Sequence, residues 1–441
     1  MKPTTPLLPI VALTALLLGA PAHAADTPAD PALPDAALVA RVLLQSPMVQ
    51  AADARIRVAT ARERELTAGP HEWTVELSGQ RRRANPSGAP SERFNEWGAA
   101  IDRTQRLPGK AALDAQLGAG GVDLAQVARG DALHQAARDL LGAWFEWLRG
   151  VAAVDQWTAQ IASLEAQAQA VARRQALGDA ARLDAVQAQA AVAQARAELS
   201  SAVARRDAAA ELLRRRYPAL PLATPAQIGE PPALDSDAQA WIDAMLEHNH
   251  ELRLARGHSR QARLGARRAG RERTPDPTLG LFVSSERGGE EKVIGARLSI
   301  PLPGGGRRAR ADAAVAEADM AAREEAAALQ RATADAATAV HGAATARQAW
   351  LASRQASEQL GQAAELTARA YRLGEGSFDA LLLAQRRARE AALATRLLQL
   401  DALERHDRVL LDAHRLWALD GADDAPADAS GMPHPDTQGA L

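Results

Sequence analysis

Apolar and polar residues alternate in four segments of the chain, and this alternation predicts β-strands. A side-chain period of two is typical of a strand that has one apolar face. The segments lie in two pairs, each joined by a turn, so we expect two β-hairpins at about 72–103 and 278–300. The apolar positions of these four segments are Trp73, Val75, Leu77, Trp97, Ile101, Leu279, Leu281, Val283, Ile294, Leu298 and Ile300.

A different period governs most of the remaining chain. Leu140, Trp147, Val154 and Ile161 are spaced by seven, and Leu403, Leu410 and Trp417 repeat this spacing near the end of the chain. A sustained period of seven indicates long helices that wind around one another. We therefore expect a long helical hairpin at about 108–216 and a second at about 304–418.

Each long hairpin contains a glycine where the helical pattern reverses. The stretch 370–385 reads AYRLGEGSFDALLLAQ, and the stretch 176–189 reads ALGDAARLDAVQAQ, so Gly178 corresponds to Gly374. Glycine accepts the left-handed conformation that ends a helix, and Ser377 is placed to cap the helix that follows. The chain is therefore a candidate for an internal duplication.

The pattern divides the chain into five parts. A leader occupies 1–24, a first repeat 25–217, a linker 218–234, a second repeat 235–418 and a tail 419–441. In the first repeat, two short helices are expected at 35–44 and 47–68, ahead of the first hairpin. In the second, 235–247 and 249–273 are the equivalent helices. The Asp-, Pro- and Gly-rich tail is typical of disorder.

The N-terminal segment resembles a secretory signal peptide. Lys2 supplies a positive start, a short apolar run follows it, and Ala22 and Ala24 give a small-x-small cleavage site. The apolar run is shorter than the roughly 20 residues of a membrane-spanning helix. No later stretch approaches such a helix, so we expect an exported protein without a helical membrane span.

Composition excludes several classes of protein. The chain of 441 residues has a formal net charge of −2, which does not favour nucleic-acid binding. It has no cysteine, which excludes disulfides, a thiol nucleophile and a lipid-modified N-terminal cysteine. Aromatic residues make up 3% and alanine dominates the apolar residues, which predicts thin layers of closely packed helices.

The two predicted β-hairpins need a partner for their apolar faces. A lone two-stranded hairpin is marginal in water, whereas a closed sheet satisfies its backbone within a bilayer. Strands of about ten residues fit a tilted transmembrane strand, but a barrel needs about eight or more of them. Lipid on the apolar faces and a barrel shared between copies of the chain are therefore expected.

The order of these elements resembles TolC-type outer-membrane efflux channels. The resemblance rests on the strand entry at 275–280, the Pro- and Gly-rich strand exit at 301–305 and the stretch 370–385, and it covers roughly 35–418. It implies a mostly helical homotrimer in the outer membrane of a Gram-negative bacterium. Its twelve strands would form a barrel, and its twelve helices would continue the barrel as a periplasmic tunnel.

The resemblance also implies partners and a passive role. The helical turns would dock a periplasmic adaptor protein, and an inner-membrane efflux pump, of the resistance-nodulation-division type, would supply the energy. The compact size and the opening DAALVARVLLQSP look most like channels of heavy-metal or cation resistance. The implied docking residues are Gly178, Asp179, Tyr371, Arg372, Gly374, Glu375, Gly376 and Ser377.

An acidic ring that narrows the tunnel is a further feature of the family. Family members often carry an acidic residue where this chain has Leu383, so that position supplies no carboxylate for a ring here. Asp184 and Asp379 are the candidates for a constriction in its place.

Other polar groups give no catalytic or cofactor site. His248, His250 and His258 are interpreted as solvated helix histidines, because on a helix only His250 and His258 share a face and no carboxylate or cysteine completes a metal site. The loop residues 81–83, three arginines, fit either lipid head groups or solvent. We expect no enzyme activity, no cofactor and no bound metal.

An alternative function fits the long helices alone. A periplasmic adaptor or a coiled-coil scaffold of an export system is also built of long helical hairpins. The four alternating strands, each next to a Pro- and Gly-rich segment, favour the channel.

Overall fold

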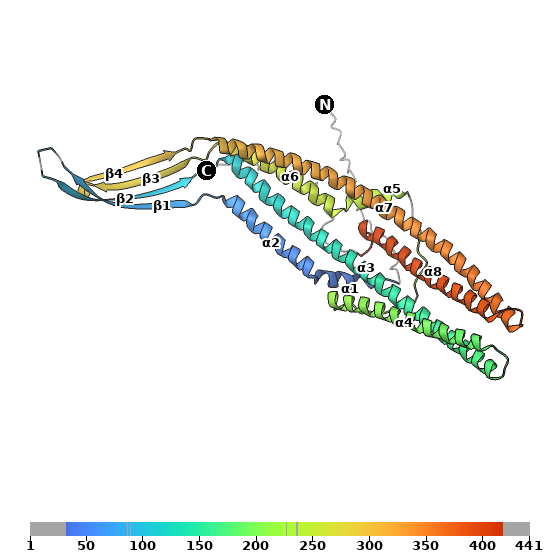
Figure 1. Ribbon diagram of the computed structural model, residues 1–441. Helices are drawn as coiled ribbons and strands as arrows, with labels where there is room; N and C mark the ends of the chain where they lie inside the picture. The colour runs from blue at the N-terminus through green and yellow to red at the C-terminus, as the bar shows by residue number, and fades with distance from the viewer. Residues whose placement is uncertain (1–31, 86, 89, 226, 235–236, 418–441) are drawn as a thin grey trace, which may run out of the picture.

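The computed structural model describes residues 32–85, 87, 88, 90–225, 227–234 and 237–417. The molecule is elongated, with a β-sheet at one end and two helical turns at the other (Figure 1). The expected leader 1–24 and tail 419–441 lie outside the described residues. The expectation that most of the chain is helical is confirmed.

All four strands belong to one antiparallel sheet of order β1-β2-β3-β4. The strands are β1 (Trp73–Ala84), β2 (Glu92–Thr104), β3 (Thr278–Glu286) and β4 (Glu291–Ser299). The predicted hairpins are therefore present, and pairing of β2 with β3 joins them. Two details differ from the prediction. Arginines 81–83 extend β1 instead of lying in a loop, and Ile300 lies just beyond β4.

Two helices run the length of the helical part. α3 (Pro108–Ala176) has 69 residues and α7 (Gly305–Arg372) has 68, so each spans roughly 100 Å at 1.5 Å per residue. Both lack internal proline after their first turn and are rich in alanine, which favours an uninterrupted helix.

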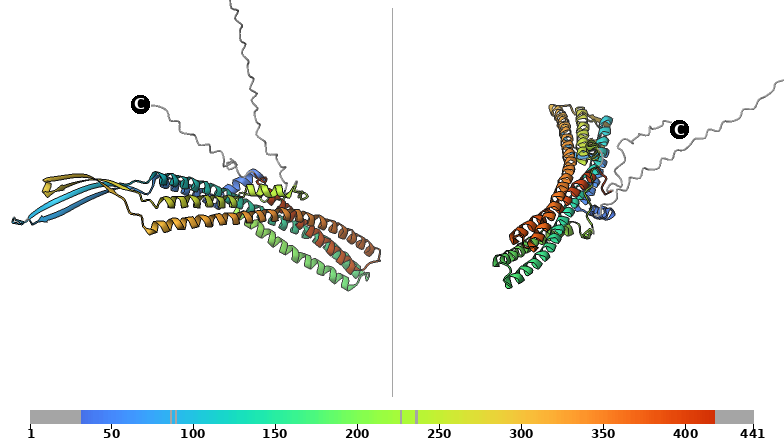
Figure 2. Two further views of the ribbon diagram at one scale, coloured as in Figure 1. Left: turned by 90° about the horizontal axis from the view of Figure 1, so that it is seen from above. Right: turned by 90° about the vertical axis from the view of Figure 1, so that its right-hand side faces the viewer.

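Shorter helices lie beside these two rods. Near the sheet, α2 (Pro47–Ala68) packs on α3, and α6 (His250–Arg271) packs between α3 and α7. Toward the helical turns, α4 (Arg182–Arg216) packs on α3, and α8 (Phe378–Asp412) packs on α7 and α3. Viewed from the end, the helices follow a thin arc (Figure 2). The expected thin layers of helices are confirmed.

Small residues bring the helices close together. A Cβ atom at Gly118 would lie 2.9 Å from the backbone Cα of Glu63 on α2, and one at Gly120 would lie 2.6 Å from Gln261 on α6. The glycines of this cluster therefore allow α3 to touch both neighbours.

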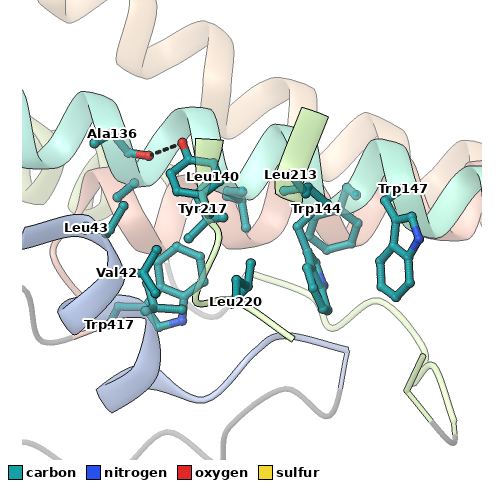
Figure 3. Close-up of a cluster of buried hydrophobic side chains, with 14 of the residues drawn as sticks. Val42, Leu43, Ala136, Leu140, Trp144, Trp147, Leu213, Tyr217, Leu220 and Trp417 are labelled. Carbon is teal, nitrogen blue, oxygen red and sulfur yellow. Dashed lines mark hydrogen bonds between the residues drawn. The ribbon is translucent and has the colours of Figure 1, made fainter. Parts of the chain in front are cut away.

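The large side chains gather halfway along the helices. Here α1 (Ala36–Leu44) and the first turn of α2 cover the middle of α3 and the end of α4. Trp144 and Trp147 are buried in this cluster, as the period of seven predicts, and the hydroxyl of Tyr217 donates a hydrogen bond of 3.4 Å to the carbonyl oxygen of Ala136 (Figure 3). Trp417 joins the cluster, but from a segment that follows α8, so its predicted helical position is wrong.

A second, smaller cluster lies beside the first. The helix α5 (Ala238–Glu247) packs Trp241 and Met245 against the middle of α7 and the end of α8. Together the two clusters form a belt around the middle of the helical part. On the sheet side of this belt α2 and α6 flank the rods, and on the side of the helical turns α4 and α8 flank them.

Candidate functional site: the sheet and the helical turns

One face of the sheet carries apolar residues in continuous rows. The register places Val75 beside Ile101, Ile101 beside Leu281 and Leu281 beside Ala296. These side chains are open to the surroundings: Leu77 is 78% exposed and Ile294 is 86% exposed. Within the described residues, no helix packs extensively on the sheet. The apolar face is therefore uncovered.

The opposite face of the sheet is mainly polar and partly shielded. Arg297 on β4 donates a hydrogen bond of 3.0 Å to the carboxylate of Asp102 on β2. Nearer the end of the sheet that lies away from the helices, Glu96 accepts a hydrogen bond of 2.7 Å from Gln80 and pairs with Arg82 at 3.2 Å. In β3, Leu279, Leu281 and Val283 are exposed, whereas the residues between them, which include Phe282, are less exposed. This is the reverse of the pattern of a sheet that covers a water-soluble core.

A network of charged groups joins the sheet to the helices. Lys110 on α3 is 1% exposed, and its Nζ lies 2.9 Å from Oδ1 of Asp276 and 3.3 Å from a carboxylate oxygen of Glu272. The same oxygen of Asp276 accepts a hydrogen bond of 3.1 Å from the backbone N–H of Leu107. The Pro- and Gly-rich segments that leave β2 and enter β3 are thereby tied together.

The ion pairs determine the protonation of this junction. Burial alone raises the pKa of Asp276, but hydrogen bonds from Lys110 and Leu107 outweigh it and hold the pKa below the usual value. Burial likewise raises the pKa of Glu272, and hydrogen bonds from Arg268 and Arg307 outweigh it, so that this pKa is lowered as well. Both carboxylates therefore stay ionised under mildly acidic conditions.

The two helical turns have the same backbone construction. Gly178 and Gly374 each have a φ of 81°, in the left-handed region that favours glycine. In each turn, the backbone N–H of the residue after the glycine donates a hydrogen bond to a carbonyl oxygen near the end of the preceding helix. Asp179 donates to Arg174 at 2.8 Å, and Glu375 donates to Ala370 at 3.0 Å. This is the Schellman motif in both copies. Ser377 accepts a hydrogen bond of 3.1 Å from Ala380, so its predicted capping role is confirmed.

The turns expose apolar side chains at equivalent positions. Leu177 is 85% exposed and Leu373 is 68% exposed, each immediately before the glycine of its turn. Of the eight predicted docking residues, Tyr371 and Gly376 are half-buried and the others are exposed. The guanidinium of Arg174 links the two turns, because it contacts Asp179 at 2.9 Å and the hydroxyl of Tyr371 at 2.9 Å.

Asp184 and Asp379 lie in the first turns of α4 and α8. Asp379 is exposed and Asp184 is half-buried. A carboxylate in the first turn of a helix also stabilises the positive end of the helix dipole. The structure thus gives the two residues equivalent places next to the two turns.

The sequence analysis missed a group of histidines at the belt. His134, His250 and His414 come from three different elements and offer ring nitrogens within 4.8 Å of one another. The prediction that His250 is solvated is wrong, because it is 4% exposed, whereas His258 is exposed as expected. The helical-wheel argument failed because His248 follows the last residue of α5 and His250 begins α6, so that they do not share a helix.

A buried carboxylate accompanies these histidines. Burial alone raises the pKa of Asp412, but hydrogen bonds from His134 and Arg138 outweigh it and lower the pKa to about 2. His134, His250, His248 and Asp412 line a cavity of about 640 Å³ between α3, α5, α6, α7 and α8.

No helix in the described part of the chain combines the length and the apolar character that crossing a membrane requires.

Comparisons with known proteins identify the fold. No family model matches the chain, and no curated protein matches it by sequence. Among solved structures, a membrane protein from Pseudomonas aeruginosa is similar, with 20% identity and a TM-score of 0.72 over 87% of this chain and 90% of that one. The outer membrane protein VceC from Vibrio cholerae shares 19% identity, with a TM-score of 0.70 over 86% of this chain and 95% of that one.

The CmeC outer membrane channel of Campylobacter jejuni is similar at lower identity. It shares 13% identity, with a TM-score of 0.72 over 88% of this chain and 86% of the channel. The chain therefore has the fold of these membrane proteins along almost its entire described length. The resemblance inferred from the sequence is confirmed at the level of the fold.

Proposed function

We propose that the chain is the outer-membrane channel of a tripartite efflux system, a passive homotrimeric conduit from the periplasm to the exterior of a Gram-negative bacterium. The observation that carries this proposal is the sheet, whose apolar face is uncovered while its opposite face holds ion pairs. Water disfavours such a face, whereas lipid matches it.

The tryptophans of the sheet support this orientation. Trp73 lies beside Arg103 in the register, and Trp97 is six residues before Arg103 on β2, which corresponds to about 20 Å along the strand. Transmembrane barrels have aromatic side chains at both interfaces of an apolar band about 25 Å tall. The guanidinium of Arg103 stacks over Trp73, 5.2 Å from the ring centre, as an interfacial cation would. At a strand tilt of about 35–45°, about 20 Å along the strand corresponds to only about 15 Å of height, so Trp73 would mark one edge of the bilayer and Trp97 would lie within the apolar band.

The edges of the sheet support a trimer. β1 and β4 are the outer strands of an antiparallel sheet of four, so they run in opposite directions. If β4 of one copy pairs with β1 of the next, the antiparallel order continues without interruption, and three copies give a closed barrel of twelve strands. Closure also removes the unpaired edges of each copy. The arc of helices would form a third of the periplasmic tunnel in the same assembly.

The helical turns are proposed as the docking surface for a periplasmic adaptor protein. They lie at the end opposite the sheet (Figure 1), and each presents an exposed leucine, Leu177 or Leu373, next to a rigid glycine turn. Exposed apolar groups at loop tips are typical of contacts with a partner. The adaptor would connect the channel to an inner-membrane pump of the resistance-nodulation-division type.

A constriction next to the helical turns is part of the proposal. Asp184 and Asp379, repeated in three copies, would place carboxylates near the periplasmic end of the tunnel. The polar face of the sheet carries both positive and negative groups, for example Arg297 and Asp102. This fits a passage that admits solutes of either charge. Export of heavy-metal cations is the subtype that the opening of the chain favours, and it stays a prediction.

Lipid contact can be tested with a matched pair of adjacent residues. The chain has no cysteine, so a single cysteine at Leu77→Cys or Ser78→Cys accepts a fluorophore without background. In liposomes that contain brominated lipids, we expect strong quenching at position 77, on the apolar face, and weak quenching at position 78. Equal quenching at both positions would contradict the assignment of faces.

Cell fractionation distinguishes the channel from the alternative function, a periplasmic adaptor or scaffold. A channel is recovered with outer membranes as a trimer, whereas an adaptor or scaffold without a membrane-facing sheet is recovered from the periplasm. Recovery as a soluble monomer would exclude the proposed function.

A further inference from the structure

Three histidines meet at the belt from distant parts of the sequence. His134 lies in the middle of α3, His250 is the first residue of α6, and His414 follows the end of α8. Their ring centres are 5.7 Å apart for His134 and His250, 5.4 Å for His134 and His414, and 5.3 Å for His250 and His414. A fourth ring, that of His248, stacks on His414 at 4.6 Å.

The backbone of His414 is held in a costly conformation. Its φ is 54°, and its N–H and that of Arg415 complete a Schellman motif after α8, with hydrogen bonds of 3.0 Å to Leu411 and 2.7 Å to Leu410. The equivalent positions of the two helical turns are the glycines 178 and 374. A side chain in this conformation costs about 1 kcal/mol. The chain thus uses histidine at a position that glycine would fill at lower cost, which is typical of a functional constraint.

A glycine provides the space for a second of the rings. A Cβ atom at Gly130, one helical turn before His134 on α3, would lie 2.7 Å from Cε1 of His250. Only glycine therefore allows the His250 imidazole to lie against α3 next to His134.

The third ring is oriented by a carboxylate. Nε2 of His134 lies 3.1 Å from Oδ1 of Asp412, and Arg138 and Arg408 also donate to Asp412. A carboxylate between two guanidiniums is an acceptor, so Nε2 carries the hydrogen and Nδ1 keeps its lone pair. Histidine ligands of metals are usually oriented by such a hydrogen bond from the second ring nitrogen to a carboxylate.

The cavity that His134 and His250 line favours a cation. Its lining includes six carboxylates (Asp131, Glu251, Asp335, Asp401, Glu404 and Asp412) and four arginines (Arg138, Arg149, Arg405 and Arg408). With the imidazoles neutral, the lining has an excess of negative charge, and its volume leaves room for water molecules on a bound ion.

We propose that His134, His250 and His414 bind one divalent transition-metal ion of the zinc type in each chain. Three imidazole nitrogens suit zinc and its neighbours, and His248 or a water molecule completes four-coordination. In a tetrahedral site with bonds of about 2.0 Å, the ligand nitrogens lie about 3.3 Å apart. The nitrogens here lie within 4.8 Å, so small side-chain rotations bring them to this spacing.

The ion would cross-link three elements that come from distant parts of the sequence. The beginning of α6 and the segment after α8 both contact α3 at the belt. The chain does not connect α6 to α8 at this point. A metal ion bound to one histidine from each would fix this junction. The site lies far from both the sheet and the helical turns, so it is independent of membrane insertion and of docking.

Cobalt provides a direct probe, because Co²⁺ in a tetrahedral nitrogen site absorbs visible light. The full-length protein, purified in detergent and treated with a chelator, is titrated with Co²⁺ and then with Zn²⁺. We expect one Co²⁺ per chain, with tetrahedral absorption that Zn²⁺ abolishes. His134→Gln, which keeps a donor for Asp412, and His250→Ala should each weaken binding at least tenfold. His258→Ala, which removes an exposed histidine of α6, should leave binding unchanged.

His414→Gly separates metal binding from folding. Glycine relieves the left-handed backbone, so this variant should melt at the same or a higher temperature than wild type without metal, yet lose the stabilisation that Zn²⁺ gives to wild type. The proposal is overturned if wild type binds no Co²⁺, or if the variants at positions 134, 250 and 414 bind it as wild type does.

Discussion

Arg174 and Tyr371 connect the two helical turns through a hydrogen bond of 2.9 Å from the guanidinium to the phenol oxygen. The arginine belongs to the last turn of α3 and the tyrosine to the last turn of α7, so this contact joins the ends of the two long rods. The guanidinium also lies 5.6 Å from the centre of the tyrosine ring, and the ring packs on Phe378 of α8. This polar contact adds to the apolar packing of Val171 and Ala188 against Phe378 and Leu381, which also joins the two hairpins next to the turns.

Loss of this hydrogen bond should loosen the turns. In Tyr371→Phe, the ring and its packing on Phe378 remain, but the acceptor for Arg174 is gone. We expect a broader distribution of distances between spin labels at Leu177→Cys and Leu373→Cys. Arg173→Ala, which changes an exposed neighbour, should leave the distribution as it is in wild type. A narrow distribution in Tyr371→Phe would show that the bond does not hold the turns.

Both turns need glycine for a geometric reason. Proline has a φ near −65°, whereas Gly178 and Gly374 have a φ of 81°. Replacing both with proline should distort the two turns and abolish export, while the sheet at the opposite end still assembles in the membrane. Resistance of cells and trimer recovery are the two measurements. Unchanged resistance would argue against docking at the turns.

The junction between sheet and helices should make stability depend on pH. The pKa values of Asp276 and Glu272 are lowered in the folded protein, so their stabilisation is complete above the ordinary carboxyl pKa of about 4 and is lost as pH falls through the lowered values. Asp276→Asn leaves Lys110 without one of its buried partners, which should cost about 3 kcal/mol near neutral pH.

The loss should shrink in acid, because protonation removes the same charge from wild type. Melting of the helical circular dichroism signal between pH 7 and pH 3 measures this, with Asp123→Asn, an exposed carboxylate of α3, as the control. A constant difference between Asp276→Asn and wild type at all pH values would contradict the ion-pair explanation.

Two glycines of α3 should respond to alanine in opposite ways. A Cβ atom at Gly150 would lie 2.7 Å from the backbone Cα of Arg206, so Gly150→Ala should push α4 away and destabilise the hairpin by about 1–3 kcal/mol. At Gly142, the nearest atom is a side-chain oxygen of Glu404 at 3.7 Å, an ordinary contact. Gly142→Ala should therefore stabilise the helix by up to about 1 kcal/mol. Thermal melting of the two variants side by side tests the close approach of α3 and α4.

The local patterns of the sequence were sufficient for the elements and for the two helical turns, but not for every element's end: β1 continues through residues 81–83, and Trp417 lies beyond α8. Alternation at 73–77 and 279–283 predicts strands because each strand has one apolar face, and Gly178 and Gly374 predict turns because few other residues adopt a positive φ. The direction in which the apolar face points was inferred from the absence of a partner within each repeat, and the uncovered Leu77 and Ile294 agree with it.

Contacts between distant segments could not be predicted from the same patterns. Pairing of β2 with β3 depends on residues separated by the whole first helical hairpin. The histidine cluster depends on three positions, 134, 250 and 414, that no local spacing relates, and on the helix break at Asn249 that brings His248 beside His414. The one local signal was Gly130, whose role is visible only once His250 is placed against it.

The continuity of α3 and α7 has a mechanical consequence. These two rods run from the charged junction at Lys110 to the linked turns at Arg174 and Tyr371, whereas the neighbouring columns are each divided at the belt. When the helical turns tilt, the two rods therefore transmit this movement along their length. The divided columns, α2 with α4 and α6 with α8, allow the distance between helices to change at the belt. We expect the belt to act as the fulcrum when the periplasmic end widens.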